Sequence, residues 1–107
     1  MATIVRGTND AAVDSLRSAL DEYEATHPGS EASLYRQSPG SIRLRIIDDR
    51  FAGVSLSRRH DELWDFLSRR VGDDTMGEVS ILLAFPRSEL KRSLANQDYE
   101  DPIPFDL

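Results

Sequence analysis

The chain has 107 residues, 39% of them apolar and 30% charged, and its 19 acidic and 13 basic residues give a formal net charge of −6. This length suits one compact domain with a modest core and leaves no room for a second. The sequence has no cysteine, which excludes disulfides, cysteine-held zinc or iron–sulfur sites and thiol catalysis. The acidic balance also disfavours non-specific binding to nucleic acid.

No apolar stretch approaches the roughly 20 residues that cross a bilayer, and the longest apolar run covers only residues 81–85. The first residues lack the apolar centre of a secretory signal peptide. We therefore expect a cytoplasmic protein without a membrane partner.

A first helix is predicted by apolar residues at helical spacing, namely Val13, Leu16, Leu20 and Tyr23. Residues 8–10 supply N-cap candidates for this helix. The sequence His-Pro-Gly-Ser that follows the helix is typical of a helix end.

Two short strands are predicted at residues 31–37 and 41–48, joined by a Ser-Pro-Gly turn. In the second strand, apolar residues alternate with Arg43 and Arg45. Because successive strand side chains point to opposite faces, one face is buried and the arginine face is either wet or partnered. This alternation is typical of an antiparallel sheet that helices cover on one side only.

A second helix is predicted to begin at an N-cap Ser57 and to end at Gly72. Leu63, Trp64 and Leu67 lie on its apolar side. A strand follows at residues 79–85, and its lack of alternation indicates that both of its faces are covered.

The last part of the chain is predicted to contain a short helix, from Pro86 to about residue 94. Residues 95–107 hold four acids, no base and two prolines, which predicts an acidic, flexible tail. We expect one domain over residues 1–94. Its elements, in the order α-β-β-α-β-α, predict an α+β two-layer sandwich, with helices on one face of a three-stranded sheet.

The acidic residues do not predict a catalytic pair. Asp48 and Asp49 are adjacent, so in a strand they would point to opposite faces. Asp73 and Asp74 fall in a loop after a helix, where solvated acids are common. Neither pair has an evident environment that would shift its pKa for acid–base work.

The other catalytic and ligand-binding patterns are also weak. His60 lies near Ser55 and Ser57, but the segment lacks the strand-to-helix motif that exposes a nucleophilic serine. The only other histidine is His27, and no metal-ligand spacing occurs. The glycines at 72 and 77 lack the Lys and Ser/Thr of a phosphate loop, and the Gly-x-x-Gly loop of KH domains is absent. We expect no enzyme, no metal and no cofactor.

The adjacent arginines Arg58 and Arg59 are unusual because they open a predicted helix, where the helix dipole disfavours cations. Two interpretations remain open. In the first interpretation, the two arginines form ion pairs with nearby acids. The candidate acids are Asp61, Glu62, Asp48 and Asp49. Alternatively, they contact an acidic partner or a nucleic-acid backbone.

The segment 49–60 resembles the signature of the BolA family, which is a Phe-x-Gly turn, five residues and then Arg-His at a helix start. Phe51, Gly53, Arg59 and His60 stand at that spacing. The similarity continues through Trp64 and Leu67 on the helix and covers about residues 10–92. It implies a KH-like fold of the type II kind with the element order given above.

The resemblance also implies a function. BolA-like proteins are non-enzymatic; some are stress-linked regulators with proposed DNA binding, and many share a [2Fe–2S] cluster with a monothiol glutaredoxin. The implied ligands are a histidine near the end of the last strand and a His or Cys between the first two strands. Here the last strand ends in Ala84 and Phe85, and the turn is Ser-Pro-Gly. We therefore expect no cluster sharing.

These observations predict a BolA-like protein-interaction or regulatory module with an unidentified protein partner. Its partner-binding residues would be Phe51, Gly53, Arg58, Arg59 and His60. The alternative is a nucleic-acid-binding transcriptional regulator, for which the candidate residues are Arg43, Arg45, Arg58 and Arg59. A small enzyme would need a cleft in which His60 meets an acid.

Overall fold

The computed structural model describes residues 1–102, and its sheet has four strands rather than the three expected. In spatial order these are β1 (Thr3–Arg6), β2 (Glu31–Ser38), β3 (Ser41–Ile47) and β4 (Val79–Phe85). β2 and β3 are antiparallel, whereas β1 runs parallel to β2 and β4 parallel to β3. The prediction missed β1 because four residues are too few to show a strand period.

Of the α-helices described, one connects β1 to β2, two connect β3 to β4, and one follows β4. They are α1 (Ala11–Thr26), α2 (Leu56–Ser68), α3 (Asp73–Met76) and α4 (Leu94–Glu100), with short 3₁₀ helices at η1 (Asp49–Phe51) and η2 (Arg87–Arg92). The carboxylate of Asp10 caps α1 by accepting a hydrogen bond from the N–H of Val13 at 3.0 Å. Ser55 caps α2, so this helix begins earlier than the predicted cap at Ser57. None of the helices described is long and apolar enough to cross a membrane.

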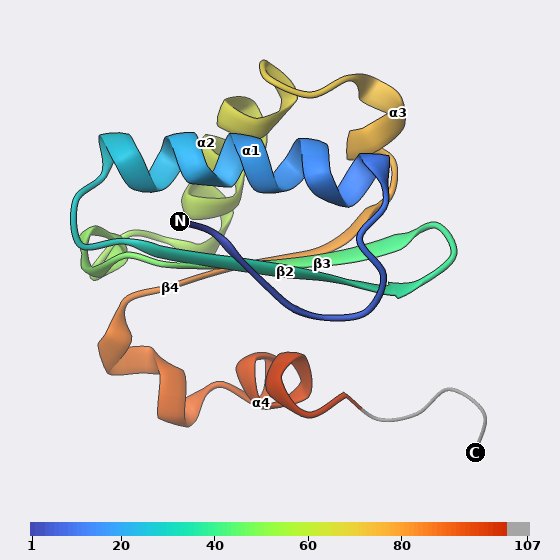
Figure 1. Cartoon of the computed structure of the whole chain (residues 1–107). Helices are drawn as coiled ribbons and strands as arrows, with labels where there is room; N and C mark the ends of the chain where they lie inside the picture. The colour runs from blue at the N-terminus through green and yellow to red at the C-terminus, as the bar shows by residue number, and fades with distance from the viewer. Residues whose placement is uncertain (103–107) are drawn as a thin grey trace.

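The α+β class is confirmed, but helices cover both faces of the sheet rather than one. Figure 1 shows α1 and α2 on one side and the C-terminal segment with α4 on the other. The main core lies on the α1 and α2 side, where apolar residues of both helices and of the strands are fully buried; they include Leu16, Leu20, Leu34, Leu44 and Leu67.

The C-terminal segment differs from the predicted flexible tail, because α4 packs on the sheet. The ring of Tyr99 is 2% exposed, its hydroxyl lies 2.8 Å from the hydroxyl of Ser33, and its carbonyl accepts hydrogen bonds from Tyr35 and Arg6 at 3.1 and 3.0 Å. Composition could not reveal this packing, since it depends on strand residues more than 60 positions away. Residues 103–107 of the predicted tail lie outside the described part.

Candidate functional site

The turn between β3 and α2 contains two residues that were predicted to bind a partner. Phe51 ends η1 and is 4% exposed, so its ring belongs to the core. Gly53 has a φ of 79°, a left-handed conformation that glycine adopts without steric cost. Both residues shape the turn that starts α2, and Phe51 offers almost no surface to a partner.

Arg59 is buried at the start of α2 and joins four segments of the chain. Its guanidinium donates to the carbonyls of Val54 at 2.9 Å and Ala84 at 3.0 Å. It also holds both carboxylate oxygens of Glu89 on η2, each at 2.9 Å. The hydrogen bonds from Arg59 lower the pKa of Glu89 below its usual range. Arg59 is therefore paired within the chain, and its acid is none of those that the sequence suggested.

The neighbouring residues Arg58 and His60 point outward. Arg58 has an exposed side chain that lies 3.7 Å from Glu62, one turn further along α2. His60 is also exposed, and its ring stacks on Trp64 with centroids 5.6 Å apart. Of the five predicted partner-binding residues, only these two present an exposed side chain that could reach a partner.

An apolar groove of about 420 Å³ lies between the start of α2 and β4. Its walls come from α2, from the second half of β4 and from the segment that leads into α4. The lining residues are Leu56, Ser57, Arg59, His60, Leu82, Leu83, Ala84, Phe85, Ser93 and Ala95. The only charged group among them is the guanidinium of Arg59, which Glu89 neutralises.

The groove continues along an exposed stripe of α2, formed by Leu56, His60 and Trp64. These residues are spaced four apart, so they lie on the same side of the helix. Leu56 is 67% exposed and Trp64 is 36% exposed, which makes them two of the large apolar side chains that the described surface leaves in solvent. His60 lines both the groove and a second hollow beside Trp64. The groove and the stripe together form one surface, called here the α2–β4 surface.

The arginines predicted for nucleic-acid binding on the sheet are covered by α4. Arg43 donates to Asp98 at 3.1 Å, and Arg45 donates to Glu100 at 2.7 Å and to Asn96 at 2.8 Å. Arg43 is 9% exposed. The arginine face, predicted to be wet or partnered, is thus partnered by the chain's own C-terminal segment.

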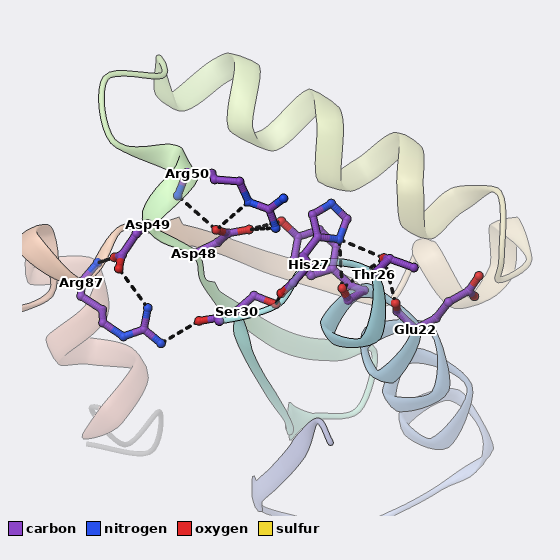
Figure 2. A network of polar contacts seen from close by, with 10 residues as sticks. Glu22, Thr26, His27, Ser30, Asp48, Asp49, Arg50 and Arg87 are labelled. Atoms are coloured by element: carbon purple, nitrogen blue, oxygen red, sulfur yellow. Dashed lines mark hydrogen bonds and ion pairs between the residues drawn. The ribbon is translucent and has the colours of Figure 1, made fainter.

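The adjacent acids Asp48 and Asp49 turn to different partners, as Figure 2 shows. Asp48 accepts hydrogen bonds from the hydroxyl of Tyr23 at 2.9 Å and from Arg50 at 3.0 Å. Burial opposes ionisation of Asp48, but the hydrogen bonds from Arg50 and Tyr23 outweigh it and lower its pKa. Asp49 instead pairs with Arg87 at 3.2 Å. The two carboxylates therefore take part in separate ion pairs and do not share a proton.

The remaining catalytic candidates are used structurally or stay apart. His27 stacks on Tyr23 with centroids 3.9 Å apart, and Ser55 accepts from the N–H of Arg58 at 3.3 Å. Across residues 1–102, no hydrogen bond joins His60 to Ser57 or to an acid. The acids at 73 and 74 form the exposed first turn of α3.

The residues present do not fit a [2Fe–2S] cluster of the kind that the resemblance implies. The β2–β3 turn is Ser-Pro-Gly, and β4 ends in Ala84 and Phe85, which are buried. These side chains offer neither thiolate nor imidazole. In the described part of the chain, no group of three or more His, Cys, Asp or Glu side chains is placed to hold a metal ion.

The sequence reasoning missed the groove itself. Leu82 and Ala84 were assigned to a strand covered on both faces, and Leu56 was not singled out. A signal was available in the spacing of Leu56, His60 and Trp64, since a single exposed stripe at four-residue intervals is visible once α2 is known to begin at Leu56. The strand edge beside the stripe depends on the order of the sheet, which no local pattern contains.

Comparisons of the chain with protein-family models, with curated proteins and with solved structures found no match.

Proposed function

We propose that the chain is a non-enzymatic, BolA-like protein-interaction module that binds a partner protein through its α2–β4 surface. The observation that carries the proposal is the apolar groove beside Leu56, which opens onto a stripe with two large, exposed apolar side chains. Contiguous exposed apolar surface of this kind marks interaction sites in soluble domains.

Two further observations support the proposal. The elements α1, β2, β3, α2 and β4 follow one another as the BolA resemblance implies, although the structure adds β1 before them and α3 among them. Among residues 1–102, His27 lies 3.0 Å from the hydroxyl of Thr26 and His60 shares a hollow with Asp61 and Asp65, but no acid is hydrogen-bonded to either histidine, which disfavours the small-enzyme hypothesis. The nucleic-acid alternative finds less support, because Arg43, Arg45 and Arg59 are all paired with acids.

Site-specific photo-crosslinking in the native cell tests the proposal. A photoreactive amino acid at Leu56 should give a discrete adduct with one protein. The matched control places the same group at Leu94, which is 79% exposed but does not line the groove, and should give no such adduct. Equal adducts at both positions, or none at Leu56, would contradict the proposal.

A further inference from the structure

The edge of the sheet at β4 is open to pairing. In the sheet that the described residues form, β4 has a neighbouring strand on one side only. Its seven residues include no charge and no proline. Soluble proteins usually protect a free edge with such residues, because its unpaired N–H and C=O groups pair readily with another chain. The opposite edge, β1, is four residues long and ends in Arg6.

Hydrogen bonds fix which backbone groups of β4 face the groove. The carbonyl of Phe85 points toward β3, since it accepts from the N–H of Asp48 at 2.9 Å. Backbone groups alternate in direction along a strand, so those of Ala84 and Leu82 point away from β3. The hydrogen bond from Arg59 to the carbonyl of Ala84 reaches that carbonyl from the free side and agrees with this orientation. The N–H and C=O of Leu82 and the N–H of Ala84 therefore face the groove.

The walls of the groove determine what can pair there. α2 lies on one side of the sheet, and the C-terminal segment, which contributes Ser93 and Ala95 to the lining, lies on the other (Figure 1). A recessed edge admits a single extended chain at the strand spacing of about 4.8 Å.

The chemistry of the lining specifies the occupant further. The groove presents leucine, alanine and phenylalanine side chains, no acid, and one guanidinium that is already neutralised. A charged side chain placed there would lose its hydration without gaining a partner. Alternate side chains of an extended segment would point toward Leu56 and His60 of α2, where large apolar groups fit, while those between them would point toward Ser93 and Ala95.

Resting on the proposed function, we infer that the partner contributes an extended segment with alternating apolar residues, which adds to the sheet as a fifth strand along β4. Its backbone pairs with the N–H and C=O of Leu82 and with the N–H of Ala84. Arg59 occupies the carbonyl of Ala84 and so ends the pairing there. Main-chain hydrogen bonds then supply affinity, and the groove supplies the preference for apolar side chains.

A phage-displayed library of random linear peptides, selected on the full chain, provides the probe. Enriched peptides should show apolar residues at alternate positions. N-methylation of a peptide amide that pairs with Leu82 should weaken binding at least about fivefold, the equivalent of one hydrogen bond. N-methylation of the intervening amides should change binding little. A helical ligand would not produce this alternation.

Two variants separate the failure of this inference from the failure of the proposed function. Leu56→Asp places a carboxylate at the groove and should abolish binding, whereas Leu94→Asp, at a similarly exposed position outside it, should not. If Leu56→Asp abolishes peptide binding but the selected peptides show no alternation of apolar residues, strand addition is overturned. The α2–β4 surface would then still be the docking surface. Absence of any enriched peptide, or no effect of Leu56→Asp, would overturn both. A stable dimer in sedimentation that Leu56→Asp dissociates would show a second copy as the occupant and overturn the inference.

Discussion

The arginine face of the sheet was predicted as a possible nucleic-acid surface and the start of α2 as a partner-binding one, and the structure leaves these two regions in opposite states. α4 closes the first with Asp98 and Glu100, which pair with Arg43 and Arg45. The second stays open, with Leu56 exposed beside an apolar groove. In the part of the chain that the structure describes, most charged residues have partners within the chain, whereas the groove beside Leu56 is apolar. Exposed apolar groups therefore support the proposed binding surface better than the arginines support the nucleic-acid alternative.

Removing the packing of α4 on the arginine face should have the largest effect on the stability of the chain. Tyr99→Ala removes a buried ring and should lower the free energy of unfolding by about 3–5 kcal/mol, measured by urea denaturation. Tyr99→Phe keeps the ring and loses only the hydrogen bond to Ser33, so it should cost about 1 kcal/mol. A Tyr99→Ala variant as stable as the wild type would show that α4 does not hold the face closed.

The two adjacent arginines at the start of α2 differ in burial, because Arg59 is buried and Arg58 is exposed. Arg59→Ala leaves the carboxylate of Glu89 and two carbonyls without their donor, and it should lower the free energy of unfolding by about 3 kcal/mol. Arg58→Ala removes an exposed and distant ion pair, so its effect should stay below about 0.5 kcal/mol. Chemical denaturation of the two variants side by side measures the difference. Equal effects would mean that Arg59 does not anchor this end of the groove.

Lowering the pH should weaken the ion pairs that the carboxylates form before it affects the apolar surface. Hydrogen bonds from Arg36 lower the pKa of Asp10 to about 2, and those of Glu89 and Asp48 are lowered as well. In the unfolded chain these groups titrate near pH 4. Their contribution to stability is therefore complete above about pH 5 and is lost as the pH falls through 4 toward 2. Urea midpoints measured from pH 7 to 2 should follow this course; stability that rises below pH 4 would contradict it.

The smallest expected effect is on nucleic-acid binding. Because Arg43, Arg45 and Arg59 are paired, we expect no gel shift with single-stranded or duplex DNA at low salt. Arg58→Ala should leave that result unchanged. A salt-dependent shift that Arg43→Ala abolishes would show that α4 leaves the arginine face and would revive the alternative function.

Local patterns predicted α1, α2 and the central hairpin because their signals lie within a few residues, as in the cap at Asp10 and the alternation around Arg43. They failed where a partner is distant in sequence. α4 depends on arginines more than 50 positions away, and Arg59 depends on Glu89. The groove needs the spatial order of the strands, which a one-dimensional pattern does not contain. His60 was predicted as a surface residue from the family motif, whereas Leu56 required the structure.

The contact between Arg6 and α4 has a consequence for synthesis of the chain. Arg6 donates to the carbonyls of Tyr99 and Glu100, which lie 93 and 94 residues further along. A chain synthesised from its N-terminus can close this contact only after residues 99 and 100 have emerged. β3, α2 and β4 lie within residues 41–85 and can assemble earlier. Until α4 has emerged, the nascent protein therefore carries Arg43 and Arg45 uncovered on its sheet.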